Sequence, residues 1–246
     1  MTAADSQGQG FIWFDQPEPP SAERLSRARI VQTAMALADD EPSGAITMRA
    51  LAARLGVRSP MALYRYVTNK DSLDDLMIDE VYGTITIPTG QGWRVALQGL
   101  GISGWAAMQR HPWAARLAYS RPPIGPGAVR LFDTALTELD PLNLDASTRM
   151  GYINTILGHV FGSGLALLEE RTMRARTSHT TDADLNRAIA PYLARIAQAG
   201  QHPHFSQWAA DPDRHNPPPQ TFEHILEWLL DGLQTLTNPS ARSTVS

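Results

Sequence analysis

The spacing of apolar residues is the strongest constraint on the fold of this chain. From Ser26 onward they recur three or four residues apart, as on one face of a helix, and no segment shows the apolar and polar alternation of a half-buried strand. Clusters of proline and glycine at 121–127, 200–203 and 217–219 interrupt this pattern. We therefore predict an all-α fold without a sheet.

Four short helices are predicted in the N-terminal third of the chain. They should begin at four residues whose side chains can accept hydrogen bonds from a first helical turn: Ser26, Thr47, Ser59 and Asn69. Gly56 suits the left-handed end of the second helix, and Pro60 suits the first position of the third. Further helices are expected over 92–109, 112–119, 126–139, 145–170, 182–199 and 220–237.

These helices suggest a small domain followed by a larger one, as the length of 246 residues also does. Residues 1–21 are rich in Gln, Gly and Pro and are predicted to be a flexible arm. Residues 22–70 form the small domain, residues 71–238 the larger helical domain, and residues 239–246 a disordered tail. The aromatic group at 11–14 is unusual for an arm, and we expect it either to pack on the body or to stay unresolved.

The charge is unevenly distributed along the sequence. Residues 1–21 carry a net charge of −3, residues 22–70 hold eight basic and four acidic residues, and the remainder holds 13 basic and 18 acidic residues. A basic segment on an acidic molecule is typical of a DNA-binding module attached to a regulatory body, although chance fluctuation is the alternative.

Composition also excludes several classes of protein. The chain has no cysteine, which removes disulfides, thiolate zinc sites and cysteine nucleophiles and suits a reducing compartment. No stretch approaches the roughly 20 uninterrupted apolar residues of a membrane helix, and the N-terminus lacks the pattern of a signal peptide. We expect a cytoplasmic protein that does not interact with a membrane.

The segment from Thr47 to Tyr66 predicts a helix-turn-helix: two short helices joined by a tight turn, the second with a polar and aromatic outer face. Arg65 could read guanine in the major groove, and Met61 and Ala62 could contact thymine methyl groups. Tyr64, Tyr66 and Lys70, the single lysine of the sequence, are better placed for phosphates. The alternative is that the tyrosines are boundary residues and the arginines a solvated face.

Residues 47–57 (TMRALAARLGV) and 62–70 (ALYRYVTNK) resemble the DNA-binding domain of the tetracycline-repressor (TetR) family. The resemblance continues in Trp93, in HPWAA at 111–115, in Arg121-Pro122, in LGHV at 157–160 and in the last helix from Phe222 to Leu233. It covers about residues 26 to 236. It implies a dimeric transcriptional repressor that binds double-stranded operator DNA and a small-molecule effector.

Residue by residue, the resemblance implies DNA contacts from the start of the second helix, from the recognition helix and from the start of the fourth. The predicted DNA-binding residues are Thr47, Arg49, Arg58, Ser59, Pro60, Met61, Ala62, Tyr64, Arg65, Tyr66 and Lys70. Between Val57 and Leu63 the chain has one residue more than the tetracycline repressor, which leaves the register of residues 59–61 against the bases open.

The resemblance further implies a homodimer held by a four-helix bundle, for which we expect each subunit to contribute helices 145–170 and 220–237. Gly158, Gly162, Ser163 and Gly164 would permit close helix approach, and a kinked internal helix is the alternative. An effector cavity is expected among helices 92–109, 112–119, 126–139 and 145–160. Its candidate residues, each of which could equally be a core residue, are Leu100, Trp105, Met108, Trp113, Leu117, Phe132, Leu136, Ile153, Asn154, His159 and Phe161.

Neither a metal nor a cofactor is expected. Where the tetracycline repressor uses histidines and an asparagine for the drug and its magnesium, this chain aligns Thr86, Leu100 and Leu117 or Ala118. None of these can replace an imidazole as a metal ligand, so a less polar effector than tetracycline is expected.

Three other functions were considered from the sequence. An enzyme would need convergent catalytic groups, but the seven histidines show no metal-ligand spacing, and His202 and His204 are expected in a surface loop. The second is a helical interaction module that does not bind DNA. The third is a transcriptional activator with the same fold.

Overall fold

The computed structural model of the chain describes residues 12–14, 25–41, 43–177, 181–210 and 221–237. These residues form helices without any strand, which confirms the all-α prediction. The α-helices are α1 (Arg27–Asp40), α2 (Met48–Leu55), α3 (Lys70–Thr84), α4 (Trp93–Arg110), α5 (Trp113–Ser120), α6 (Pro126–Leu139), α7 (Ala146–Arg176), α8 (Asp182–Ala199), α9 (Pro203–Ala210) and α10 (Phe222–Thr237). Three short 3₁₀ helices are η1 (Ile12–Phe14), η2 (Pro60–Arg65) and η3 (Asp140–Leu142).

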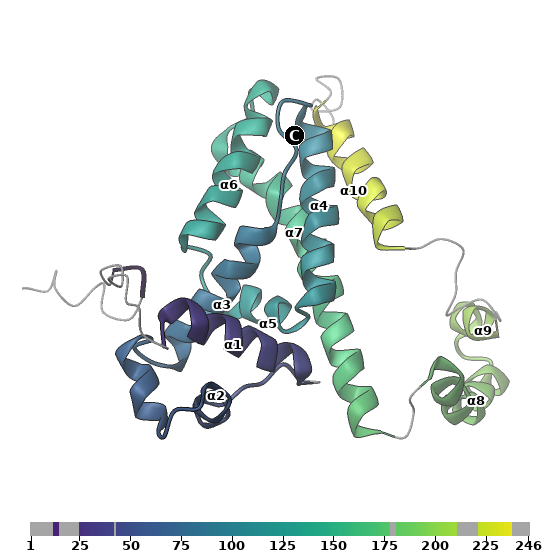
Figure 1. Cartoon of the computed structure of the whole chain (residues 1–246). Coiled ribbons are helices and arrows are strands. Elements are labelled where there is room, and N and C mark those ends of the chain that lie inside the picture. The colour runs from purple at the N-terminus through teal and green to yellow at the C-terminus, as the bar shows by residue number, and fades with distance from the viewer. Residues whose placement is uncertain (1–11, 15–24, 42, 178–180, 211–220, 238–246) are drawn as a thin grey trace, which may run out of the picture.

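Helices α3 to α7 and α10 pack into one body, and α1, α2 and η2 form a small unit at one end of it (Figure 1). The long helix α7 runs through the body against α4, α5, α6 and α10. It has the length and composition of a membrane-crossing helix, and 44% of its most apolar window is buried inside the protein.

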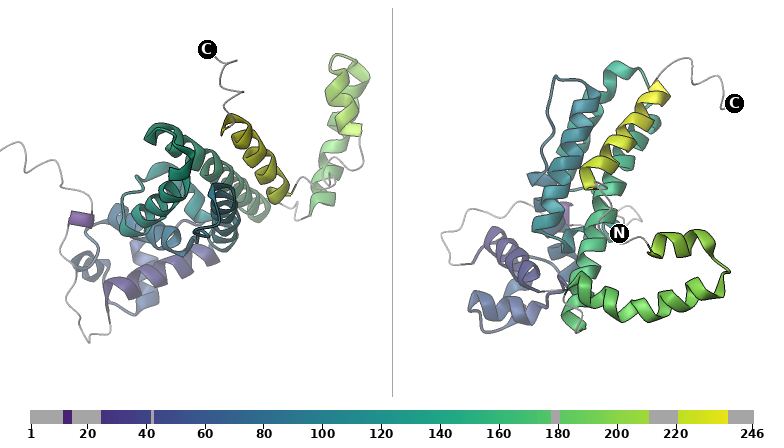
Figure 2. Two further views of the ribbon diagram at one scale, coloured as in Figure 1. Left: turned by 90° about the horizontal axis from the view of Figure 1, so that it is seen from above. Right: turned by 90° about the vertical axis from the view of Figure 1, so that its right-hand side faces the viewer.

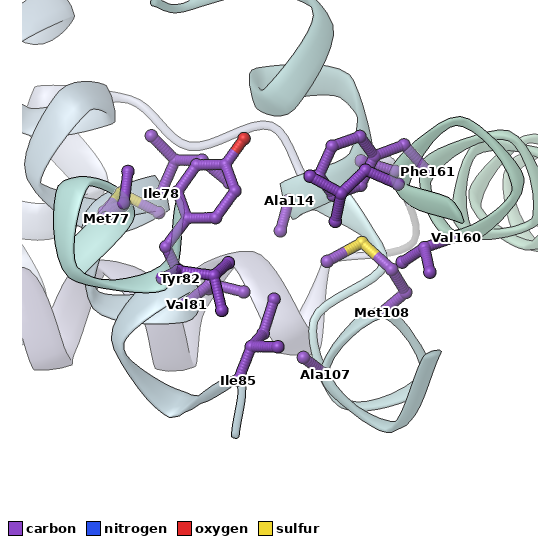
Figure 3. Packing of buried hydrophobic residues seen from close by; sticks show 14 of the residues in the cluster. Met77, Ile78, Val81, Tyr82, Ile85, Ala107, Met108, Ala114, Val160 and Phe161 are labelled. Carbon is purple, nitrogen blue, oxygen red and sulfur yellow. The ribbon is translucent and has the colours of Figure 1, made fainter. Parts of the chain in front are cut away.

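Helix α3 links the two parts. It packs on α1 of the small unit and on α5 and α6 of the body. Figure 3 shows Tyr82 and Ile85, at its C-terminal end, in one cluster with Met108 of α4 and Phe161 of α7. The rings of Tyr82 and Phe161 meet edge to face with centroids 6.1 Å apart. One continuous core therefore extends from the small unit into the body.

Helices α8 and α9 pack on each other. They stand apart from the body in Figure 1 and in the two views of Figure 2. The sequence predicted α8 at its observed bounds but not α9, which contains His204. Residues 202–204 were expected in a loop because proline usually marks a break. Pro203 instead occupies the first position of α9, where its missing N–H leaves no helical hydrogen bond unmade.

Two further expectations need correction. Helix α7 continues to Arg176, six residues beyond the predicted end at 170, and its last turn carries Arg174 and Arg176, which favour a helix C-terminus. The third helix of the small unit is a 3₁₀ helix, not an α-helix. The predicted arm and tail lie outside the described residues, except Ile12–Phe14.

Candidate nucleic-acid interface and effector site

The small unit has the helix-turn-helix geometry that the sequence predicts. Thr47 Oγ1 accepts a hydrogen bond from Ala50 N at 3.1 Å and caps α2. Gly56 ends α2 in the left-handed conformation, with a φ of 73°. Ser59 Oγ then accepts from Met61 N at 3.2 Å and starts η2. Local capping chemistry thus sets the angle at which η2 leaves α2.

The 3₁₀ form of η2 decides which of its side chains face outward. With three residues per turn, positions three apart share a face, so Pro60, Leu63 and Tyr66 lie together. Leu63 is fully buried and Tyr66 packs partly against the core. We expected Tyr64, Arg65 and Tyr66 to face away from this core. Tyr64 and Arg65 do so, but Tyr66 does not.

Most of the predicted DNA-contacting residues are exposed on one unit. Met61 is 70% and Tyr64 37% exposed. The other exposed members of the set are Thr47, Arg49, Arg58, Ser59 and Arg65, while Pro60, Ala62, Tyr66 and Lys70 are half-buried. The face therefore presents arginines beside apolar and hydroxyl groups, which matches the mixed chemistry of phosphates and base edges.

Lys70 is held by an intramolecular partner at the start of α3. Its Nζ forms an ion pair with Asp74, one turn further along the helix. Burial raises the pKa of the Asp74 carboxyl, and the hydrogen bond from Lys70 opposes that shift. A phosphate contact by Lys70 would have to share or replace this partner.

Asp39 at the end of α1 joins the small unit to the body. Its Oδ1 accepts a hydrogen bond from Trp113 Nε1 at 2.7 Å and lies 2.8 Å from His111 Nδ1. Gly44 rests on the same tryptophan, since a Cβ at Gly44 would lie 2.3 Å from Trp113 Cβ. Trp113, predicted to line the effector cavity, is thus 3% exposed and belongs to the junction between the two parts.

Arg121, just after α5, makes a second connection, to the start of α3. Its Nε donates to Asp75 Oδ1 at 2.6 Å, and its Nη2 donates to the Asp71 carbonyl at 3.1 Å. The Asp75 side chain is 2% exposed, and its hydrogen bond raises the pKa of Arg121. The guanidinium therefore fixes the end of α5 against the start of α3, the helix that follows η2.

The predicted effector residues do not gather in one cavity. Leu100, Met108, Ile153 and Phe161 are buried core residues. Trp105 and His159 both stack on Phe222, with centroids 4.9 and 4.3 Å from its ring, and so anchor α10. Leu117 borders a hollow of about 170 Å³ at the junction with the small unit.

Phe132, Leu136 and Asn154 do come together, in an open groove of about 480 Å³ between α6 and α7. Sequence reasoning missed its other lining residues, Pro123, Val129, Asp133 and Met150. Val129, Phe132 and Leu136 recur at helical spacing on α6, and Val129 is 54% exposed although apolar, a signal that could have found the groove.

Residues 88–237 match the family model described as tetracyclin repressor-like, C-terminal domain. The HTH-type transcriptional repressor DrrR1 of Streptomyces coeruleorubidus is 34% identical over 237 residues, which covers 92% of this chain and 84% of the relative. The chain belongs to the TetR family.

Other relatives agree with this assignment. An HTH-type transcriptional regulator of Saccharopolyspora erythraea is 31% identical over 87% of this chain and 91% of its own length. The structure of the Streptomyces coelicolor TetR family protein ActR in complex with actinorhodin has a TM-score of 0.67 at 24% identity, covers 87% of this chain and 99% of its own, and shows the same fold. As a TetR family member the protein is a DNA-binding transcriptional regulator and not an enzyme.

The junction at Asp39 gives a stability prediction. Asp39→Ala should lower the free energy of unfolding by about 1–3 kcal/mol, because it leaves the buried Trp113 N–H and the His111 ring without their acceptor. Asp40→Ala is the matched control, since Asp40 is exposed and pairs with Arg54 at 3.8 Å. Urea unfolding should separate the two variants, and equal midpoints would contradict the role given to Asp39.

Proposed function

We propose that this TetR family regulator is a dimeric repressor that leaves its operator when an apolar, aromatic small molecule binds the groove between α6 and α7. The observation that carries the proposal is the exposed arginine-bearing face of the helix-turn-helix, connected through α3 to the body that holds the groove. Repression, as opposed to activation, is supported by the relative DrrR1, which is named a transcriptional repressor. Operator binding also places the protein in the cytoplasm.

The DNA contacts are assigned to the exposed and half-buried residues of α2 and η2 and to the start of α3. Arg65 is proposed to read a base, Met61 and Ala62 to contact thymine methyl groups, and Tyr64, Tyr66 and Lys70 to contact phosphates. Thr47, Arg49, Arg58, Ser59 and Pro60 border the same face. Two such faces in a dimer, roughly 34–36 Å apart, would read a partly palindromic operator.

A second copy of the chain is the proposed partner for the outer faces of α7 and α10. Glycines at 151, 158 and 162 of α7 and at 232 of α10 have no close neighbours among the described residues of the subunit, and a Cβ at three of them would meet nothing there within 4 Å. Trp228 and Leu236 of α10 are exposed by 54% and 52%. Small residues beside exposed apolar ones suit close packing of helices from two subunits.

The effector class follows from the lining of the groove. Its walls are mainly apolar, with the ring of Phe132 and the side chains of Leu136 and Met150, and polar groups come from Asp133 and Asn154. An aromatic molecule with a few hydrogen-bonding groups fits this lining. Support comes from ActR, whose structures hold actinorhodin and (S)-DNPA.

Arg65→Ala tests base reading. The variant should bind the operator about 1–3 kcal/mol more weakly and should lose preference at one base position, because a bidentate contact to guanine is removed. The measurement is a mobility shift at fixed salt on the intergenic DNA beside the coding region. Arg187→Ala, the same change of charge on the distant α8, should bind as the parent does. Equal loss in both variants would show a general charge effect.

Lys70→Ala tests phosphate contact. It should weaken binding to all sequences alike and reduce the salt dependence of log Kd by about one unit of slope, since one phosphate contact is lost. Operator titrations at four salt concentrations give the slope. An unchanged slope would mean that Lys70 serves Asp74 alone.

Gly158→Trp tests the dimer. A tryptophan on the outer face of α7 should convert the dimer to a monomer at micromolar concentration, because Gly158 has open space within its own subunit but not in a closely packed bundle. Gly158→Ala should remain a dimer, and relief of the glycine cost in a helix is worth up to about 1 kcal/mol. Light scattering after size exclusion gives the mass. A dimeric Gly158→Trp would place the interface elsewhere.

Val129→Trp tests the groove. Its indole should fill the space beside Phe132 and weaken binding of actinorhodin, used as the probe, at least about tenfold, equivalent to roughly 1.4 kcal/mol. Val95→Trp on α4 is the matched control, because Val95 is also exposed but does not line the groove. Fluorescence quenching measures binding, and equal affinity of both variants would reject the groove as the site for this probe.

A further inference from the structure

The short helix η1 lies on α3, far from it in sequence and outside every site described above. Ile12 is 3% exposed, and Trp13 is half-buried. The short purple segment in Figure 1 marks η1. Of the two outcomes expected for the aromatic group at 11–14, packing on the body is the one found for Ile12 and Trp13.

Beneath η1, α3 meets the first turn of α6, and we call this contact the joint. Gly125 precedes α6 and has no side chain with which to cap it. The cap comes instead from α3, where the two carboxylate oxygens of Asp79 accept from Gly127 N and Ala128 N, each at 2.9 Å. The backbones also touch, since a Cβ at Gly127 would lie 2.4 Å from the Asp79 carbonyl oxygen.

Trp13 closes this joint from the outside. A Cβ at Gly125 would lie 2.6 Å from Trp13 Cζ2 and 2.4 Å from Asp79 Cγ, so the indole edge and the carboxylate meet over the same glycine. Trp13 Nε1 is buried without a hydrogen-bond partner in the described part of the chain. The contact is therefore held by apolar burial of Ile12 and the indole ring.

The joint lies on the path between the groove and the DNA. Ala128, whose N–H is bound by Asp79, is followed directly by Val129 of the groove. At its other end α3 begins with Lys70, five residues after the end of η2. A contact that holds the first turn of α6 on α3 thus constrains both the wall of the groove and the helix that positions η2.

We propose that Ile12 and Trp13 form an intramolecular strap, which holds α6 on α3 and keeps the DNA-binding unit in its operator-binding position. The regulatory part of this proposal rests on the proposed repressor function. Without the strap, the cap at Asp79 opens more often, α3 samples other positions, and the dimer holds its two recognition helices at the operator spacing for less of the time.

The first test is hydrogen exchange of the full-length protein, read at the amides of Gly127 and Ala128. Ile12→Asp places a charge in the buried contact, and Trp13→Ala removes the indole ring. Both variants should exchange these two amides at least tenfold faster than the parent. Ile102→Asp, the same chemical change at a 48% exposed position of α4, should leave them unchanged. Rates within twofold of the parent in both strap variants would overturn the proposal.

The second test is operator affinity without any effector. Ile12→Asp and Trp13→Ala should each lose at least threefold, and Ile102→Asp should lose nothing. Faster exchange with unchanged operator affinity would overturn the regulatory role. If the parent itself does not bind operator, the proposed repressor function fails, while the exchange rates at Gly127 and Ala128 still decide whether the strap exists.

Discussion

The fixed position of α3 between the small unit and the body is the constraint on which the rest of the structure depends. Leu73 lies fully buried near its start and Tyr82 is buried near its end, so one rigid helix belongs to both cores. Its acidic side chains fix its position: Asp75 binds Arg121 after α5, and Asp79 caps α6. Because desolvation of a buried ion pair offsets much of its attraction, the contact between Asp75 and Arg121 determines geometry more than stability. A helix held by directional contacts on two sides has few alternative positions.

Local chemistry explains what could be predicted from the sequence. The caps at Thr47, Ser59 and Asn69 and the turn at Gly56 depend on residues within four positions of each other, and all were found as predicted. The 3₁₀ form of η2 was not predictable in this way, since periodicity over six residues hardly separates 3.0 from 3.6 residues per turn. Tyr66 follows Leu63 by three residues, one 3₁₀ turn, and so packs partly against the core.

The effector site was predicted less well, because its residues are decided by contacts between distant helices. Trp113 meets Asp39 across 74 residues, and His159 meets Phe222 across 63. An aromatic residue on an apolar helix face predicts burial but not its neighbour. The glycines of α7 illustrate the same point: a Cβ at Gly164 would lie 2.8 Å from Met108 Cγ, while a Cβ at Gly158 would meet nothing within 4 Å in the described part of the chain. Similar sequence signals thus serve different interfaces.

Magnitudes suggest how little movement at α6 is needed for a response. Two hydrogen bonds to the charged Asp79 carboxylate contribute about 1.5–3 kcal/mol each. A typical coupling between two ligand sites is roughly 1–3 kcal/mol. A partial loss of this cap therefore changes the free energy of the α3–α6 contact by as much as a typical coupling between sites. An effector that binds against Val129 lies one residue from this cap. Its effect therefore need not pass through the whole core to change how α3 is held.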